Sequence, residues 1–216
     1  MFIKICGVTS VADANMIAGA GANAIGLNFY PASPRSVTTE IAQDIVQHIP
    51  PYVEPVGLFV NAMPSLIRQT VLSVGLRTLQ LHGDVTPEII ADLREFSVMP
   101  SFPLREAENV EAVLGFLASC RQLGRLPSAI LLDAYSPESY GGTGNIAPWP
   151  LARELVRQSN LPVILAGGLT SKNVAKAIRA VQPWGVDVAS GVEVAPGRKE
   201  PFKVRSFIEE ARRASS

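Results

Sequence analysis

The sequence predicts an α/β fold, a closed (βα)8 TIM barrel, because short apolar runs alternate with helix-like segments along the whole chain. There are eight runs in 216 residues, and most are continuously apolar, as in strands buried on both faces of a parallel sheet. The predicted strands are Phe2–Val8, Ala24–Phe29, Pro55–Val60, Thr78–His82, Val98–Leu104, Ala129–Ala134, Pro162–Gly167 and Val186–Ser190.

An open, doubly wound sheet is the alternative architecture. It would leave two edge strands, and none of the eight runs has the polar character of an edge. No Ser- or Gly-rich linker divides the chain, so residues 1–216 are predicted to form a single domain.

The segments between the strands show helical spacing. Apolar residues three and four apart predict helices around 174–181 and 204–211. Proline in the first turn marks helix starts at Thr86-Pro87 and Met63-Pro64. A further helix within 35–50, with Ile41, Ile45 and Ile49 on its apolar face, should stop before Pro50, and a long one should occupy 105–124.

The composition gives no support for binding to nucleic acid or to a membrane. Lys and Arg together number 19, as do Asp and Glu, so net charge gives no argument for nucleic acid or an anionic membrane. No apolar run has the length of a membrane span, and no signal peptide is apparent. Cys6 and Cys120 lie far apart in the chain, which favours free thiols in a cytoplasmic protein. The pattern leaves monomer and homodimer open.

Two titratable side chains stand where a barrel places its active site, at the carboxyl ends of the strands. Cys6 ends the first predicted strand and Asp133 the sixth, so they can face each other across the barrel mouth. A thiol and a carboxyl in this arrangement can serve as general base and general acid. Their positions also suit a small buried group at Cys6 and a helix cap or ion pair at Asp133.

Glycine-rich loops follow the seventh and eighth strands. Gly167-Gly168 and Ser190-Gly191 would let backbone N–H groups approach an anion. Loops in these two places are the usual phosphate site of such barrels. The glycine-rich segment Tyr135–Pro148 is predicted to be a mobile loop after the sixth strand.

Four further residues invite a functional or structural assignment. Arg35, in a proline-stiffened loop, is either a solvated surface residue or a planar fork for a substrate carboxylate. Lys4 and Asp187, on the first and last strands, are predicted to form a structural ion pair inside the barrel. His82 is either a hydrogen-bonded residue of the rim or a substrate contact.

An ordered set of motifs covering nearly the whole chain resembles the phosphoribosylanthranilate isomerase family of tryptophan biosynthesis. Each motif alone is modest, and their order makes the set specific. The motifs are Lys4-Ile5-Cys6-Gly7-Val8-Thr9, Gly26-Leu27-Asn28-Phe29-Tyr30, Ser33-Pro34-Arg35, Gly57-Leu58-Phe59-Val60-Asn61, Leu79-Gln80-Leu81-His82-Gly83, Leu132-Asp133, Gly141-Gly142-Thr143-Gly144, Ala166-Gly167-Gly168-Leu169 and Asp187-Val188-Ala189-Ser190-Gly191-Val192-Glu193.

The resemblance implies an Amadori rearrangement of N-(5-phosphoribosyl)anthranilate, a small phosphosugar, without metal or cofactor. It implies that Cys6 is the general base at ribose C2 and Asp133 the general acid at the ring oxygen. Arg35 would orient the substrate through its anthranilate carboxylate. Backbone amides around Gly142, Gly168 and Gly191 would hold the phosphate.

Two other functions are compatible with parts of this pattern. One is another phosphosugar barrel. The analogous histidine-pathway isomerase resembles a duplicated half-barrel with Asp at the end of the first strand, whereas this chain has Cys6 there and no internal repeat. A pentulose-phosphate epimerase binds a metal through His and Asp ligands, but this chain has only His48 and His82, and His48 falls on a predicted helix, so a metal site has little support. The other function is that of a non-catalytic phosphosugar-binding barrel, which would need neither Cys6 nor Asp133.

Overall fold

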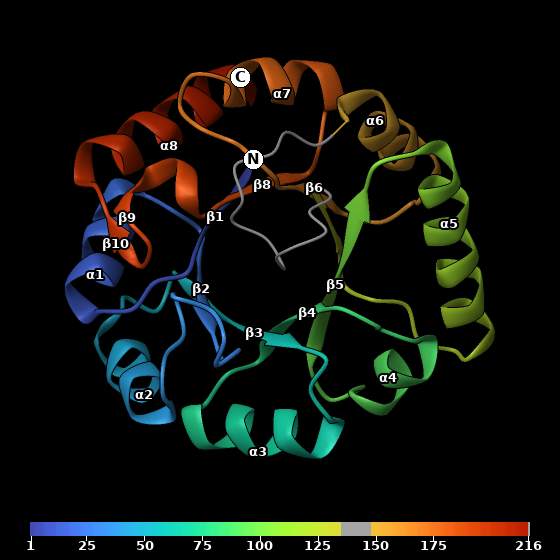
Figure 1. Cartoon of the computed structure of the whole chain (residues 1–216), viewed down its shortest axis with the longest axis horizontal. Helices are drawn as coiled ribbons and strands as arrows, with labels where there is room; N and C mark the ends of the chain where they lie inside the picture. The colour runs from blue at the N-terminus through green and yellow to red at the C-terminus, as the bar shows by residue number, and fades with distance from the viewer. Residues whose placement is uncertain (135–147, 216) are drawn as a thin grey trace.

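The eight buried runs form a closed barrel of parallel strands in sequence order, as predicted. The computed structural model describes residues 1–134 and 148–215. Figure 1 looks down the barrel, with the strands around the axis and the helices in an outer ring. The strands are β1 (Phe2–Cys6), β2 (Ala24–Asn28), β3 (Glu54–Val60), β4 (Thr78–His82), β5 (Ser97–Leu104), β6 (Ile130–Ala134), β7 (Val163–Leu165) and β8 (Gly185–Val188).

One helix lies between each pair of successive strands, and another follows β8. They are α1 (Val11–Ala20), α2 (Thr39–His48), α3 (Pro64–Val74), α4 (Pro87–Asp92), α5 (Ala107–Gln122), α6 (Trp149–Gln158), α7 (Val174–Val181) and α8 (Pro201–Ser215). A 3-10 turn (Ser190–Val192) and a small hairpin, β9 (Glu193–Ala195) with β10 (Arg198–Lys199), separate β8 from α8. In Figure 1 this hairpin lies beside α1, at the end of the barrel that faces the viewer.

The predicted helical faces are largely confirmed. The apolar positions of α7 (Val174, Ala177, Ile178 and Val181) are all buried, and so are the corresponding positions of α8. The prediction for Ile41 in α2 was wrong, because its side chain is 41% exposed. Ala42 and Ile45 face the barrel instead, so the buried stripe of α2 is narrower than the sequence suggested.

Two apolar layers hold the barrel together. The larger lies between the strands and the helices, and the smaller fills the barrel interior with side chains such as Val56, Met99, Leu131 and Ile164. The barrel is therefore a packed core, and its open end is left for ligands. Within the described ranges, no helix is long and apolar enough to cross a membrane.

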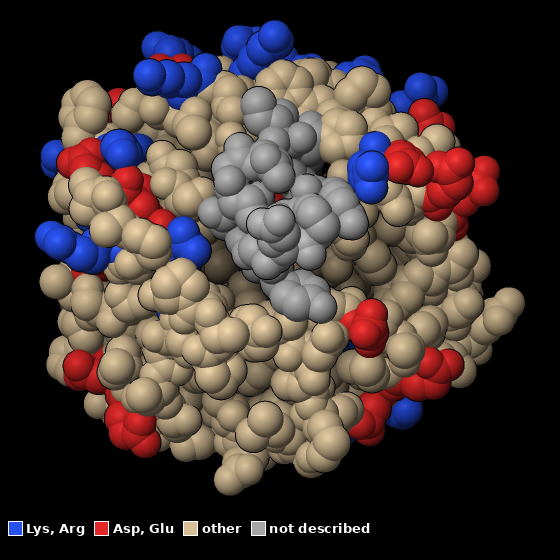
Figure 2. All heavy atoms as spheres, in the orientation of Figure 1, with Lys and Arg blue, Asp and Glu red and all other residues tan. Residues whose placement is uncertain are grey.

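Charged side chains are distributed unevenly over the face seen in Figure 1. Figure 2, in the same orientation, shows Lys and Arg gathered along the edge over α7 and α8. The opposite edge, over α3, carries few charges in this view.

Candidate active site

Cys6 is the last residue of β1, where the chain turns out of the barrel. Gly7 follows with φ 73°, a conformation that favours glycine, so the strand ends directly after the thiol. Cys6 is 7% exposed and is a free cysteine. Gly26 of β2 lies opposite Cys6 in the strand register, and a Cβ added there would stand 2.6 Å from Cys6 Sγ. The thiol thus occupies space that only glycine leaves open.

The predicted ion pair between Lys4 and Asp187 is confirmed. Lys4 Nζ lies 2.8 Å from Asp187 Oδ1, on strands whose register places the two residues side by side. Burial alone lowers the pKa of Lys4, but attraction to Asp187 and Cys6 outweighs it, so that the pKa is raised and the amine stays charged. Lys4 and Cys6 also interact electrostatically, an effect that raises the pKa of Lys4 and lowers that of Cys6. Lys4 is therefore part of the thiol's surroundings as well as of the barrel interior.

The thiol of Cys6 has opposing influences on its ionisation. Burial raises the pKa of Cys6, and so does the Asp187 carboxylate. The ammonium groups of Lys4 and Lys199 act in the other direction, although the net pKa remains above its ordinary value. The two lysines are the local source of thiolate stabilisation.

The hairpin of β9 and β10 carries two charged residues that sequence reasoning did not assign a role. Lys199 Nζ is fully buried and donates to Glu193 Oε1 at 2.7 Å, to the Cys6 carbonyl at 2.5 Å and to the Ala189 carbonyl at 3.4 Å. Burial lowers the pKa of Lys199, an effect that Glu193 opposes. Lys199 thus ties the hairpin to the ends of β1 and β8.

Arg35 lies on a loop that local hydrogen bonds hold in place. Asn28, at the end of β2, donates to Ser33 Oγ at 3.0 Å, and the same oxygen accepts from Arg35 N at 3.2 Å. The side chain of Arg35 is only 13% exposed and pairs with Glu193, with Nη2 2.8 Å from Oε2. A Cβ added to Gly7 would stand 2.5 Å from Arg35 Cδ, so the stem of Arg35 lies over the turn that follows Cys6. Arg35 is therefore a fixed, largely buried cation beside Cys6.

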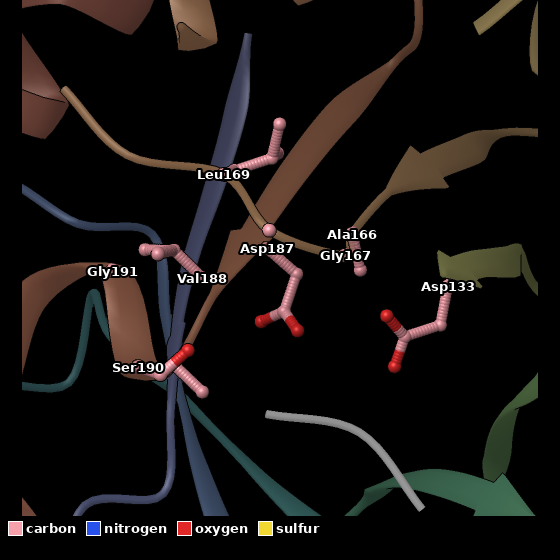
Figure 3. Close-up of a pocket in the computed structure, with 10 residues that line it drawn as sticks. Asp133, Ala166, Gly167, Leu169, Asp187, Val188, Ser190 and Gly191 are labelled. Atoms are coloured by element: carbon pink, nitrogen blue, oxygen red, sulfur yellow. The ribbon is translucent and has the colours of Figure 1, made fainter. Parts of the chain in front are cut away.

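Asp133 and the two glycine loops line one pocket of about 300 Å3 at the open end of the barrel. In Figure 3 the carboxylates of Asp133 and Asp187 point into the same space, and the hydroxyl of Ser190 lies at its edge. The loops after β7 and β8 touch, since a Cβ on Gly191 would stand 1.9 Å from the Leu169 carbonyl oxygen. Gly168, like Gly191, lines this pocket.

The predicted phosphate loops thus share a pocket with the predicted acid. The first loop depends on its glycines, because Gly167 and Gly168 have φ of 84° and 63°, a left-handed conformation that other residues rarely adopt. Asn173, just before α7, donates to the Gly168 carbonyl at 2.9 Å and holds the first loop. Gly142 and the predicted mobile loop Tyr135–Pro148, except Pro148 itself, lie outside the described residues.

His82 lies apart from this pocket. It ends β4 and lines a separate pocket of about 240 Å3 with residues of the β3 and β4 loops. Its Nε2 lies 2.6 Å from Gln80 Nε2, so the ring nitrogen accepts from the amide. Burial, and then the charge of Lys4, lowers the pKa of His82 to about 3, so the ring is neutral. A contact with substrate remains a prediction.

The closed barrel, with a buried thiol, a carboxyl and two glycine loops at the carboxyl ends of its strands, defines the chain as a (βα)8-barrel enzyme. Comparison with known families identifies which one. The family model of N-(5'-phosphoribosyl)anthranilate (PRA) isomerase matches residues 3–210. The chain belongs to this isomerase family.

Individual relatives agree. The N-(5'-phosphoribosyl)anthranilate isomerase of Pelobacter propionicus is 42% identical over 214 residues, covering 99% of this chain and 97% of that protein. That of Magnetococcus marinus is 45% identical over 215 residues, covering 98% and 95%. The crystal structure of phosphoribosyl anthranilate isomerase from Thermotoga maritima has a TM-score of 0.88 and 36% identity, covering 98% of each chain. A phosphoribosyl anthranilate isomerase solved in complex with reduced 1-(o-carboxyphenylamino)-1-deoxyribulose 5-phosphate has a TM-score of 0.84 and 33% identity, covering 98% of each chain.

Proposed function

We propose that this isomerase converts N-(5-phosphoribosyl)anthranilate to 1-(2-carboxyphenylamino)-1-deoxyribulose 5-phosphate, by acid and base catalysis from Asp133 and Cys6. The observation that carries the proposal is the pocket at the open end of the barrel. It brings Asp133 together with the glycine loops after β7 and β8, directly beside the Lys4–Asp187 pair that adjoins Cys6.

The reaction begins with two proton transfers, one from Asp133 and one to Cys6. Asp133 gives a proton to the furanose ring oxygen, the bond from that oxygen to C1 breaks, and the anthranilate nitrogen forms a double bond to C1. The resulting iminium acidifies the proton on C2, which the thiolate of Cys6 removes. The enol that forms gives the ketone when C1 takes back a proton from the Cys6 thiol and the C2 hydroxyl loses its proton, which restores the acid. Each transfer by a positioned side chain is worth roughly 10² to 10⁴ in rate.

Ionisation of the thiol is the demanding part of this scheme. A buried thiolate needs compensating positive charge, and Lys4 and Lys199 supply it. Asp133 must carry its proton when ring opening begins. Enzymes that use one side chain as acid and another as base typically raise the pKa of the acid.

Binding would use both ends of the substrate. Backbone N–H groups near Gly168 and Gly191 suit the phosphate, because both glycines line the pocket of Asp133. Arg35 suits the anthranilate carboxylate, because a guanidinium binds a planar carboxylate through paired hydrogen bonds. The proposed ligand is thus a small phosphosugar. The proposed compartment is the cytoplasm, since Cys6 and Cys120 are free thiols.

The test is a turnover assay that follows loss of phosphoribosylanthranilate fluorescence. We expect Cys6→Ala and Asp133→Asn to lose about a hundredfold or more in kcat. The matched controls are Cys120→Ala, a buried cysteine on α5, and Asp92→Asn, an exposed aspartate at the end of α4. Both controls should keep wild-type kcat.

Two outcomes would count against the proposal. A wild type that binds the reduced product analogue without turning over substrate would favour the non-catalytic barrel. Full activity in Cys6→Ala or Asp133→Asn would remove that residue from the mechanism. Crystals soaked in phosphate should show the anion on backbone amides near Gly168 and Gly191.

A further inference from the structure

Glu193 holds Arg35 by one edge of its guanidinium. Arg35 Nε lies 3.0 Å from Oε1 and 3.2 Å from Oε2, and Nη2 lies 2.8 Å from Oε2. These contacts use the side of the group formed by Nε and Nη2. Within the part of the chain that the structure describes, no hydrogen bond from Nη1 is found. The end of the guanidinium formed by Nη1 and Nη2 is thus available to a second carboxylate.

Glu193 is itself held from the opposite side. Its Oε1 accepts from Lys199 Nζ at 2.7 Å and from Gly197 N at 3.2 Å, and its side chain is 4% exposed. Burial disfavours its charge, but Arg35 and Lys199 together bring the pKa of Glu193 below its ordinary value. Glu193 is therefore an ionised, immobile anchor rather than a surface partner of Arg35.

One side chain, Lys199, holds both the carboxylate of Glu193 and the backbone of Cys6. Lys199 donates to the backbone carbonyl of Cys6 at 2.5 Å as well as to Glu193. Glu193 and Lys199 therefore fix the position of Arg35 relative to the end of β1. Arginine fixed in advance loses less conformational entropy when it binds a ligand than a free surface arginine does.

We propose that Glu193 is a positioning residue for the substrate's aryl carboxylate: it holds Arg35 side-on, so that the free end of the guanidinium faces that carboxylate beside Cys6. This inference rests on the proposed function, which supplies the anthranilate carboxylate. It assigns Glu193 no contact with substrate. Its effect should therefore depend on whether the ligand carries the carboxylate.

Two ligands separate positioning from a merely structural role. One is the reduced product analogue with its 2-carboxyl group, and the other is the same compound made with aniline, which lacks that group. We expect Glu193→Gln to weaken binding of the carboxylated ligand about tenfold, while binding of the other changes less than about twofold. Calorimetry measures both dissociation constants.

Glu54→Gln is the matched control. Glu54 opens β3 at the opposite end of the barrel and accepts a hydrogen bond from Thr78 Oγ1 at 2.5 Å. It makes the same chemical change and should leave both dissociation constants unchanged. In an Arg35→Met background, Glu193→Gln should cause no further selective loss, because the group it positions is gone.

If Glu193→Gln does not fold, Glu193→Asp replaces it, since that variant keeps the charge and withdraws the carboxylate by one methylene. It should show the same selectivity for the carboxylated ligand.

Equal weakening of both ligands in a folded variant, or no weakening of either, would overturn the inference. A wild type that binds neither ligand would overturn the proposed function and the inference with it. A wild type that binds both equally would overturn the role of Arg35 in carboxylate binding, and thus the inference alone.

Discussion

Lys4 Nζ lies 2.8 Å from Asp187 Oδ1, and the two side chains are 0% and 8% exposed. A buried pair of this kind gains little over an apolar pair of similar size, because desolvation offsets the attraction between the charges. Removal of one partner is more costly, since it leaves the other charge without compensation. The pair therefore makes stability depend on both residues together.

The first prediction concerns this pair. Lys4→Met should lower the free energy of unfolding by about 3 kcal/mol, and the double variant Lys4→Met with Asp187→Leu should recover most of it. Because the folded-state pKa of Lys4 is raised, the stabilisation is fully present below its ordinary pKa of 10.5 and is lost as pH rises through the folded value. Urea unfolding at neutral and strongly alkaline pH measures both effects. A double variant no more stable than Lys4→Met would contradict the prediction.

The second prediction concerns the charge around Cys6. Lys4, Lys199 and Arg35 are cations and Asp187 and Glu193 are anions, so these five groups leave one positive charge that a Cys6 thiolate neutralises. Lys199→Met removes that excess. The pKa of Cys6, already raised by burial, should rise further, and kcat/KM near neutral pH should fall on the order of tenfold.

The readout is the pH at which Cys6 becomes reactive toward iodoacetamide, in a Cys120→Ala background. It should move upward in Lys199→Met. Lys172→Met provides the control, because Lys172 lies in the exposed loop before α7. An unchanged reactivity profile would show that Lys199 supports the hairpin without influencing the thiol.

The third prediction concerns Gly26. A methyl group there would stand 2.6 Å from Cys6 Sγ and 3.1 Å from Cys6 Cα, so the thiol must move. We expect Gly26→Ala to cost about 1–3 kcal/mol of stability and to reduce kcat. Gly115→Ala is the control, because nothing lies within 4 Å of an added Cβ in α5. It should stabilise the protein by about 0.5–1 kcal/mol and leave kcat unchanged. Wild-type kcat in Gly26→Ala would show that the position of the thiol tolerates the displacement.

The strands could be predicted because a closed parallel barrel requires continuous apolar runs. The prediction for β4, Thr78–His82, matches its observed bounds. The pair of Lys4 and Asp187 followed from the same geometry, since closure makes the first and last strands neighbours. Gly26 was not assigned a role from the sequence, although glycine inside a strand often marks a close approach, and in the structure it lies against Cys6.

The hairpin of β9 and β10 could not be predicted in this way. Its strands have three and two residues, too short for a hydrophobic period, and its charges resemble those of a solvated surface. Lys199 reaches the Cys6 carbonyl across 193 positions of sequence. Only the folded arrangement shows that Lys199 and Glu193 are buried, so their roles were missed. The assignments of Asp133, Arg35 and the phosphate loops remain predictions that the assays above test.

The fourth prediction concerns His82, whose pKa burial lowers from 6.5 to about 3. Between these values the unfolded chain binds a proton that the folded protein does not. Stability should therefore fall as pH decreases from about 6.5 toward 3, by up to about 1.4 kcal/mol per pH unit from this group. His82→Gln removes this dependence, so its unfolding free energy should decline less steeply with acid than that of the wild type.

His48→Gln is the control for this measurement, because His48 is an exposed histidine on α2, with its side chain 56% accessible. It should retain the wild-type slope. If His82→Gln keeps that slope as well, then His82 takes up a proton in the folded protein and its buried ring is not held neutral. A protonated ring would be able to bind an anionic substrate. The burial of His82 and its contact with Gln80 favour the neutral ring instead.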